Sequence, residues 1–265
     1  MKTVQSMSPE DKQEKVFRVF EKIAKGYDSA NVRISLGMQD SWKKMLIREL
    51  TRQDFIPGGC PNGKAFGHTD GGKVKILDLC TGTGDIAIGA AKAGTNYQII
   101  GMDFSPSMLR IAAAKARRRG LDNITWRKGN AMEIPCGDAS FDAVSISFGL
   151  RNCADPEKVL LEIKRVLKPG GRILCLESFV PENALVRPFY RLYFGRVMPL
   201  IGGGSSHRKE YEWLQESTES FLRAGELVDL MVCCGFRGVS VRRRMMGACV
   251  LHIGHKPRRA REVRR

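Results

Sequence analysis

The amino-acid sequence predicts an α/β protein with a mostly parallel seven-stranded sheet, an antiparallel C-terminal hairpin and an N-terminal helical cap. Between residues 74 and 176, short apolar runs alternate with helical patterns, which is typical of a parallel sheet covered by helices on both faces. Two of these helical patterns begin with a capping residue and a proline, at Ser105-Pro106 and Asp155-Pro156. Two further apolar runs near residue 250 are placed to pair as a hairpin.

The N-terminal segment is predicted to be helical. Ser8 is a typical N-cap residue, Pro9 suits the first helical position, and apolar side chains then recur at helical spacing up to Ile23. A second amphipathic stretch follows and ends at Leu50. We therefore expect residues 1–56 to form helices that cap the rest of the chain.

The main domain is expected at residues 73–257. A loop at residues 57–72, with six glycines and two prolines, precedes this domain, and a basic tail at residues 258–265 follows it. The predicted strands are Val74–Leu79, Gln98–Met102, Ile124–Arg127, Ala143–Ser147, Arg172–Leu176, Val239–Arg243 and Gly247–Ile253. The predicted helices are Ile86–Ala93, Pro106–Arg119, Pro156–Leu167 and Gly225–Cys234.

The composition is that of an ordinary globular protein. The chain has 265 residues, of which 43% are hydrophobic and 27% are charged, and this balance excludes the disordered and fibrous classes. No apolar run reaches the roughly 18 residues that span a bilayer, and the polar start lacks the apolar core of a signal peptide. We expect a cytoplasmic protein that is peripheral on the inner face of the cell membrane.

The chain is strongly basic, with 44 Lys and Arg residues against 28 Asp and Glu residues and a net charge of +16. Residues 237–265 contain ten of the basic residues and one acid, so this end carries +9 and the first 236 residues carry +7. A charge of this size fits a nucleic acid, an anionic membrane surface or a solvated tail without a partner. Composition does not choose between them.

The cysteines and histidines give no sign of a metal site. The 8 cysteines form no C-x-x-C pair, and the 4 histidines have no zinc-binding spacing with them. Several cysteines lie inside apolar strand-like runs, where a free cysteine is commonly a small buried hydrophobic residue. We expect reduced thiols and no metal.

A Gly-x-Gly turn, Gly82-Thr83-Gly84, follows the first predicted strand and precedes a helix. Glycines at this point let the backbone turn tightly and approach a ligand closely. At the end of the second predicted strand, Asp103 is placed to accept hydrogen bonds from the two hydroxyl groups of a ribose. The pattern Gly82-x-Gly84-x-x-Ala87 also fits the dinucleotide fingerprint, so a nicotinamide-dependent dehydrogenase remains a competing class.

After the third predicted strand comes the stretch 129–135 (GNAMEIP), where a polar side chain and a backbone amide are placed to read the edge of an adenine. Together with these positions, several stretches resemble the class I S-adenosylmethionine-dependent methyltransferases. The resemblance is closest to the quinone-biosynthesis C-methyltransferases, which act on demethylmenaquinone and on a ubiquinone precursor. The matching stretches are FEKIAKGYDSAN at 20–31, Ser35-x-Gly37 with Trp42, DLCTGTGD at 78–85, ISFGLRN at 146–152, LKPGG at 167–171 and, more weakly, 211–217 and 235–236.

The resemblance implies a Rossmann-like class I methyltransferase fold with S-adenosylmethionine as the cofactor. The cofactor-binding residues that it implies are Gly82, Thr83 and Gly84 at the methionine end, Asp103 at the ribose, Asn130 and Ala131 beside the adenine, and Ser147 beneath the sulfonium. Three features depart from the family pattern: the glycine-rich loop, Gln215 where a proline is common, and the arginine-rich end. The last two bear on substrate presentation more than on cofactor binding.

The implied activity is methyl transfer to a ring carbon of a prenylated quinol, preferably demethylmenaquinol, with a ubiquinone-precursor benzoquinol as the alternative. A quinol carbon becomes nucleophilic when its hydroxyl group, with a pKa of about 10, loses a proton, so a base or a cation must help. Arg151 is the catalytic candidate, either as a fixed cation or as the group that orients a water. An ion pair that shapes its loop is the other interpretation. We expect His207 and Tyr211 to be surface or packing residues, although both could reach the ring.

A prenyl tail would hold this acceptor in a membrane. Residues 183–201 combine aromatic side chains with three interleaved arginines, which suits an interfacial lid within a substrate segment at about 183–216. A helix packed on the sheet is the other interpretation. We expect an anionic membrane surface as a partner and no nucleic acid, and we leave a homo-oligomer open. A methyltransferase for RNA or another small molecule remains the alternative class, supported only by charge.

Overall fold

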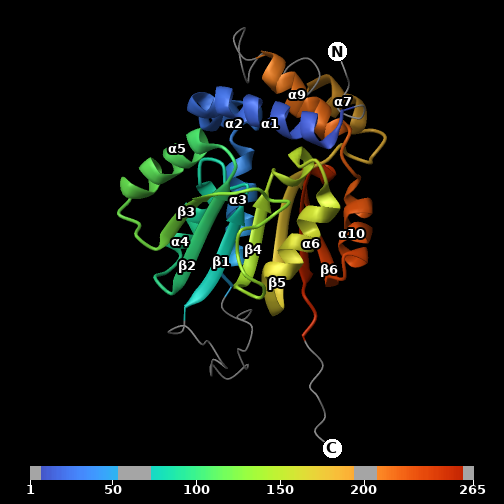
Figure 1. The fold of residues 1–265 in the computed structure, drawn as a ribbon. Coiled ribbons are helices and arrows are strands. Elements are labelled where there is room, and N and C mark those ends of the chain that lie inside the picture. Colours follow the sequence, from blue (N-terminus) through green and yellow to red (C-terminus); the bar gives the residue numbers. More distant parts are fainter. Residues whose placement is uncertain (1–6, 53–72, 194–207, 259–265) are drawn as a thin grey trace, which may run out of the picture.

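The computed structural model describes residues 7–52, 73–193 and 208–258. Four predicted features lie wholly or partly outside the described residues: the glycine-rich loop at 57–72, residues 194–207 of the predicted substrate segment, His207 within them, and the tail beyond residue 258. The described residues form one sheet with helices on both faces and a group of helices across one end (Figure 1).

Seven strands form the sheet in the order β3-β2-β1-β4-β5-β7-β6. They are β1 (Val74–Leu79), β2 (Tyr97–Asp103), β3 (Ile124–Lys128), β4 (Phe141–Ser147), β5 (Leu167–Ser178), β6 (Arg237–Arg244) and β7 (Cys249–His255). Neighbours among β1 to β5 pair in parallel, whereas β7 pairs antiparallel with both β5 and β6. The predicted fold class is confirmed, including its antiparallel C-terminal hairpin.

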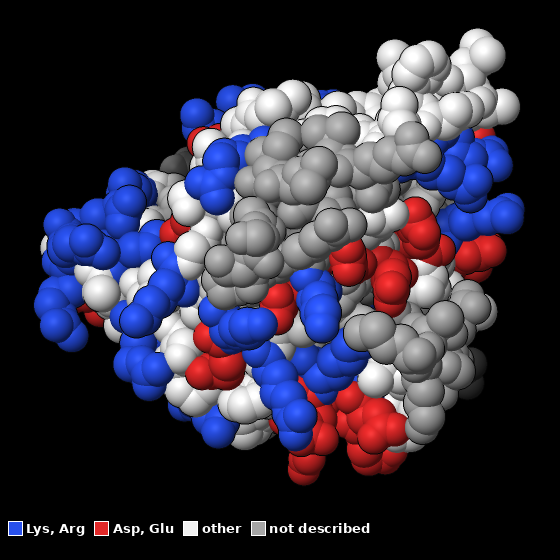
Figure 2. Space-filling model, turned by 90° about the horizontal axis from the view of Figure 1, so that it is seen from above, with Lys and Arg blue, Asp and Glu red and all other residues white. Residues whose placement is uncertain are grey.

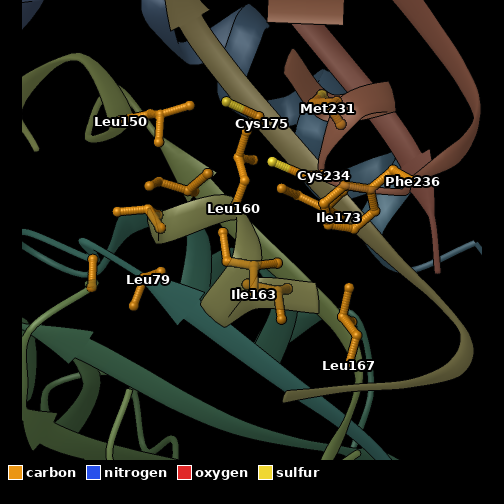
Figure 3. Packing of buried hydrophobic residues seen from close by; sticks show 14 of the residues in the cluster. Leu79, Leu150, Leu160, Ile163, Leu167, Ile173, Cys175, Met231, Cys234 and Phe236 are labelled. Carbon is orange, nitrogen blue, oxygen red and sulfur yellow. The ribbon is translucent and has the colours of Figure 1, made fainter. Parts of the chain in front are cut away.

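Both faces of the central strands β1, β2, β4, β5 and β7 are largely buried, which explains why these strands are mostly apolar. The edge strands β3 and β6 are half-buried or exposed. The helices beside the sheet are α3 (Met38–Leu50), α4 (Asp85–Lys92), α5 (Pro106–Arg117), α6 (Pro156–Val166) and α10 (Ala224–Cys233). Successive side chains of a strand point to opposite faces. In β5, Leu174 therefore packs in a cluster with α3 and α4, while Ile173 packs with α6 and α10 in the cluster that Figure 3 shows.

A third apolar cluster lies over the carboxyl ends of the strands. It joins α1 (Pro9–Ile23), α2 (Tyr27–Ile34) and α9 (Arg208–Glu219), with Trp213 of α9 buried against α1. The predicted start of α1 is confirmed, because the Ser8 side chain accepts a hydrogen bond from the Asp11 backbone at 3.1 Å. These helices, together with α7 (Arg187–Leu192), occupy the upper end of the molecule in Figure 1.

The predicted start of β5 at Arg172 is wrong by five residues, since the strand begins at Leu167, and most other predicted boundaries differ by one or two residues. Two of these differences have a clear cause. The helix expected to run to Leu167 ends at Val166, because Leu167 pairs with Phe141 and begins β5 before the Pro-Gly-Gly sequence is reached. The strand expected from Gly247 begins at Cys249, because Met245–Gly247 form a single 3-10 turn, η6. At Leu167 a long-range strand pairing overrides the helical pattern of the sequence, and before Cys249 a turn overrides the strand pattern. Helices α2 and α9 were not predicted from the sequence pattern.

Candidate functional site

A cavity of about 770 Å³ lies between α1 and the carboxyl ends of the central strands β1, β2 and β4, and we term it the strand-end cavity. Loops at this end of a parallel sheet are the usual place for ligands. The cavity walls include five of the seven cofactor-binding residues predicted from the sequence: Gly82, Asp103, Asn130, Ala131 and Ser147. Apolar side chains from α1 and from the loop after β2 complete the walls.

The glycine turn after β1 is held in place by a buried carboxylate. Asp78 accepts hydrogen bonds from the Thr81 hydroxyl at 2.5 Å, the Ser145 hydroxyl at 2.8 Å and the Ala87 backbone at 3.2 Å. Burial raises the pKa of Asp78 to about 6, and these hydrogen bonds oppose that rise. Gly82 has a φ of 55°, and a Cβ atom there would meet nothing within 4 Å, so the turn presents bare backbone.

Asp103, at the end of β2, holds the glycine turn from the neighbouring strand. One carboxylate oxygen accepts from the Gly82 backbone at 2.8 Å, and the other accepts from the Ser105 backbone at 2.9 Å. The carboxylate therefore joins the turn after β1 to the start of α5, and its remaining lone pairs are available to hydroxyl donors. Burial raises the pKa of Asp103 to about 6, although backbone hydrogen bonds oppose the rise.

Two polar atoms in the walls of the strand-end cavity are buried without a hydrogen-bond partner. They are the Ser147 hydroxyl oxygen at the end of β4 and the Asn152 side-chain oxygen in the following turn, η4 (Leu150–Asn152). A buried polar group without a partner is costly, and a polar ligand in the cavity would satisfy both atoms. The walls therefore fit an adenosine-type ligand with a polar end: bare backbone at Gly82, an acceptor pair at Asp103, and unpaired atoms near β4.

The two remaining predicted residues lie apart from the strand-end cavity. Thr83 lines a smaller adjoining cavity of about 420 Å³, and its hydroxyl donates to Asp28 of α2 at 2.6 Å. Gly84 faces the side chains of Trp126 and Ala112, which would lie 2.6 and 2.9 Å from a Cβ atom. Gly84 thus permits close packing, and its φ of 83° suits glycine.

A charged network connects the N-terminal helices to this turn. Lys115 of α5 donates to Asp28 at 2.9 Å, to the Thr83 hydroxyl at 3.2 Å, and also to Asp85 at the start of α4. Lys43 of α3 contacts Asp85 at 2.7 Å. The Asp85 carboxyl is partly buried, which raises its pKa, but the two lysines outweigh burial and the pKa is lowered overall. The network fixes α2 and α3 against the wall of the smaller cavity.

A third cavity of about 1110 Å³ lies on the other side of Tyr27 and Phe148, and we term it the aromatic cavity. Its walls contain Trp42, Tyr190 and Tyr193 as well as aliphatic side chains from α2, α9 and η6. Tyr27 and Phe148 also line the strand-end cavity, so the two cavities meet at these rings. A polar ligand in one cavity can therefore face a largely apolar ligand in the other.

Arg151 lines the aromatic cavity, and among the described residues of its walls it is the one with a charged side chain. Its guanidinium forms an ion pair with Glu177 at the end of β5 and donates to the Phe148 carbonyl at 3.0 Å. Glu177 is fully buried and also accepts from the backbones of Ser178 at 2.8 Å and Arg151 at 3.3 Å. The predicted ion pair of Arg151 is present, and the guanidinium also faces the cavity.

Phe148 owes its position to an uncommon backbone conformation. Its φ of 55° lies in the left-handed region that bulky residues rarely adopt. Cys80 at the end of β1 has a similar φ of 53°, and the Cys80 side chain would lie 2.5 Å from a Cβ atom at Gly149. The strand ends of β1 and β4 thus pack closely, and strain at such positions clusters at functional sites.

Sequence reasoning missed three residues of this site. Tyr27 and Phe148 separate the two cavities, and Glu177 neutralises Arg151. Tyr27 and Phe148 lie in two of the stretches that match the methyltransferase family, 20–31 and 146–152, so this match could have pointed to them. Glu177 had a weaker signal, since it is an acid at the end of an apolar strand. Tyr211 lies in α9, and the structure describes nothing of its side chain.

The strand order, the glycine turn after β1 and the acid at the end of β2 define a class I S-adenosylmethionine-dependent methyltransferase. Solved structures share this fold. A methyltransferase from Aquifex aeolicus superposes with a TM-score of 0.51 at 21% identity, covering 79% of this chain and 96% of that chain. Phosphoethanolamine N-methyltransferase 2 of Haemonchus contortus, in complex with S-adenosylmethionine, superposes with a TM-score of 0.55 at 18% identity, covering 81% and 56%.

The chain belongs to the ubiE/COQ5 methyltransferase family, whose sequence profile matches residues 8–256. A demethylmenaquinone methyltransferase of Anoxybacillus flavithermus is 38% identical over 94% of this chain and 98% of that protein. The demethylmenaquinone methyltransferase of Geobacillus kaustophilus is 39% identical over 93% of this chain and 99% of that protein. The protein is thus an S-adenosylmethionine-dependent C-methyltransferase, and the predicted family, enzyme class and cofactor are confirmed.

Proposed function

We propose that this enzyme transfers a methyl group from S-adenosylmethionine to a ring carbon of a prenylated quinol, and that the acceptor is demethylmenaquinol. The names of the relatives from Anoxybacillus and Geobacillus support this acceptor. The observation that carries the proposal is the pair of cavities that meet at Tyr27 and Phe148. One has the bare backbone of Gly82 and the acceptor groups of Asp103 and Asn130 that suit the methyl donor, and the other has the aromatic side chains and, among its described residues, the single cation that suit a quinol.

In the strand-end cavity, the chain itself provides the groups that hold the donor. The Gly82 backbone would hold the methionine end, the Asp103 carboxylate would accept from the ribose hydroxyls, and Asn130 would hold the adenine. Ser147 lies where β4 meets Phe148, next to the acceptor side. When bound, S-adenosylmethionine supplies an electrophilic methyl group on a sulfonium. The task of the protein is to align the acceptor with this group and to exclude water.

In the aromatic cavity, Arg151 favours ionisation of the acceptor. Burial raises the pKa of Tyr27 and of Tyr190, so both phenols stay protonated at neutral pH and act as donors rather than bases. No Asp, Glu, His or Lys lies among the described residues that line this cavity. The Arg151 guanidinium would stabilise the quinolate or orient a water that accepts the quinol proton.

Methyl labelling tests the acceptor directly. The protein is incubated with methyl-labelled S-adenosylmethionine in separate reactions with demethylmenaquinol, with a demethylated ubiquinone-precursor benzoquinol and with total RNA. We expect label in the naphthoquinol. Label confined to the benzoquinol would show that the acceptor is a benzoquinol and not a naphthoquinol. Label confined to RNA would overturn the proposal.

A prenylated acceptor also implies where the enzyme works. We infer peripheral attachment to the inner face of the cell membrane in a cytoplasmic enzyme, because the acceptor is lipid-soluble and the chain carries a net charge of +16. The basic tail, residues 258–265, is proposed as an additional electrostatic tether. In the described ranges 7–52, 73–193 and 208–258, no helix is long and apolar enough to cross a membrane.

A further inference from the structure

Large apolar side chains gather at the mouth of the aromatic cavity. Nine large hydrophobic residues are exposed in the described part of the chain, and six of them lie on three elements that surround this mouth. We term these six the apolar rim: Leu36, Leu185, Phe189, Leu192, Met245 and Met246. Large contiguous exposed patches of this kind mark interaction surfaces, whereas single exposed residues need no explanation.

The position of the apolar rim follows from residues that line the cavity. Leu36 and Met245 are themselves part of the cavity wall. Helix α7 places Tyr190 inside the wall, 8% exposed, while its neighbour Phe189 points outward and is 74% exposed. The Tyr193 hydroxyl donates to the Ile34 carbonyl at 2.7 Å, which ties α7 to the end of α2 beside Leu36. Two members of the apolar rim therefore belong to the cavity wall, and the other four lie within a few residues of wall residues in the chain.

Backbone strain accompanies three members of the apolar rim. Leu36, Met245 and Met246 have φ values of 51°, 47° and 52°, in the left-handed region that non-glycine residues rarely adopt. These turns place apolar side chains in solvent, where they gain no burial that would offset the strain. Backbone strain at exposed apolar residues supports a functional explanation, because such strain clusters at ligand-binding and functional sites.

Basic residues lie among these apolar side chains. Arg187 and Arg191 alternate with the apolar residues of α7, and Arg243 and Arg244 directly precede Met245 in the chain. Seen from this end of the molecule, Lys and Arg are spread over the surface with acidic groups between them, and a further basic group lies at the edge on the side of α5 (Figure 2). Apolar side chains flanked by cations match the boundary between anionic headgroups and acyl chains.

We propose that the apolar rim is a membrane-docking surface, which inserts into an anionic bilayer and lets the prenyl tail of the acceptor pass from the aromatic cavity into the lipid. The proposal rests on the proposed function for the identity of the tail. It commits to lipid because two residues of the rim, Leu36 and Met245, also line the cavity that takes the acceptor. A second copy of the chain on the same surface is the outcome that the experiment must distinguish.

Vesicle flotation with a matched pair of variants tests the docking surface. The test variant carries F189D and M246D, and the control carries L161D on α6 and V232D on α10, which add the same charge at residues outside the rim that are 47% and 44% exposed. We expect the native protein and the control to float with phosphatidylglycerol-containing vesicles, and the test variant to bind at least about tenfold more weakly. Equal binding of all three would overturn the proposal, as would a native dimer in ultracentrifugation that only the test variant loses.

A fluorescence measurement keeps the proposal testable if the charged variants fold poorly. F189W and L161W place a reporter on the rim and on the control surface. We expect anionic vesicles, and bromine-labelled acyl chains in particular, to blue-shift and quench the emission added by F189W and to leave that of L161W unchanged. Equal responses of the two reporters would overturn the docking surface.

Activity assays separate this proposal from the proposed function. The test variant is expected to methylate a short, soluble demethylated naphthoquinol at the native rate, and to lose at least about tenfold in rate with a long-chain quinol in vesicles. If the native protein labels no quinol but floats through the rim, the proposed function fails and the docking surface stands. If the native protein labels the quinols and the test variant matches it on vesicles, the docking surface fails.

Discussion

In the proposed donor site, the carboxyl group of Asp103 should make donor binding depend on pH. Its pKa is raised to about 6 by burial, and the ionised form would serve the two ribose hydroxyls as a double acceptor. We therefore expect the affinity for S-adenosylmethionine to be full above about pH 6 and to fall as the pH drops through that value, because the protonated carboxyl loses an acceptor oxygen. Isothermal titration calorimetry between about pH 5 and about pH 8 measures this change.

Asp103→Asn provides the control for this assignment. The amide preserves the shape but does not titrate, so above about pH 6 the variant should bind the donor more weakly than the native protein, by about 1–3 kcal/mol. Below that pH the difference should shrink, because the native carboxyl is then uncharged as well. Asp78 titrates in the same range, since its pKa is also about 6, and it remains in the variant. If Asp103→Asn keeps the full pH dependence, the dependence belongs to Asp78 and the glycine turn.

The pair formed by Arg151 and Glu177 combines a structural role with a proposed catalytic one. Arg151→Ala leaves the fully buried Glu177 carboxylate without its cation, so we expect a loss of about 3–5 kcal/mol in the free energy of unfolding. We also expect turnover to fall by at least about tenfold at unchanged donor affinity. Chemical denaturation, single-turnover rates and donor titration measure the three quantities.

A double variant separates the two roles. Arg151→Ala with Glu177→Gln removes both buried charges, and this change should recover much of the lost stability because no unpaired carboxylate remains. Turnover should stay low, since the cation beside the acceptor is still missing. Turnover that returns together with stability would show that Arg151 only shapes its loop.

The site residues that could be predicted from the sequence are those whose position is set by the end of their own strand. Gly82, Asp103 and Ser147 each follow a recognisable strand, and parallel strands bring their carboxyl ends to one edge, so these residues meet in one cavity. Glu177 and Asp28 could not be placed in this way. Their partners, Arg151 and Thr83, come from other elements, and only the packed structure decides which charges meet.

Helix α1 lines the strand-end cavity, and hydrogen bonds near its C-terminal end join it to the start of α5. Glu21 of α1 accepts from the Ser105 hydroxyl at 2.5 Å and from the Ser107 backbone at 3.0 Å, and so caps the start of α5. Partial burial raises the pKa of Glu21, but these hydrogen bonds outweigh burial and lower it overall. The contribution of the Glu21 carboxylate to folding stability is therefore complete at neutral pH, and it is lost only as the pH falls through the lowered pKa of Glu21.

Glu21→Gln should loosen this helix. The amide loses the charge and part of the acceptor capacity, which we expect to cost about 1–2 kcal/mol and to raise hydrogen exchange in α1 by roughly tenfold. Donor affinity should fall as well, because α1 supplies part of the cavity wall. Glu14→Gln is the matched control, since Glu14 lies on the same helix and pairs with Arg18 on the exposed surface. Equal exchange in both variants would contradict the role of Glu21.

Elements with strong local signals were predicted well. Pro106 and Pro156 begin their helices as predicted, with caps at Ser105 and Asp155 that accept from the backbone three residues later. The start of β5 was misplaced because its first residue is selected by pairing with Phe141, which is distant in the chain. Helix α9 was missed because its position depends on the buried Trp213 packing against α1 rather than on its own pattern.

For the whole molecule, donor binding should raise thermal stability. A ligand that binds only the folded state adds about 2.7 kcal/mol at a concentration of about 100 times its Kd, which corresponds to a rise of roughly 5–10 °C in Tm. We expect this rise with S-adenosylmethionine and none with NAD, which also tests the dinucleotide interpretation of the glycine turn. Differential scanning calorimetry measures both, and an equal rise with NAD would contradict the assignment of the cavity.

The overall architecture could be predicted from the alternation of strands and helices, but the order of the last strands could not. The two C-terminal runs were expected to pair with each other, and they do. It is β7, the later of the two, that also pairs with β5 and so lies inside the sheet, while β6 forms its edge. Local patterns in a hairpin do not show which of its strands joins the rest of the sheet.

The inserted position of β7 has a consequence for synthesis on the ribosome. β5 leaves the ribosome first, yet its free edge is covered only when β7 follows, since Ser178 pairs with Cys249 and Arg172 with His255. During that interval a nascent chain presents an unpaired, apolar strand, which is a site for association with other chains. Chains stalled before β7 should therefore engage chaperones and be cut by proteases, whereas β7 completes the sheet in one late step.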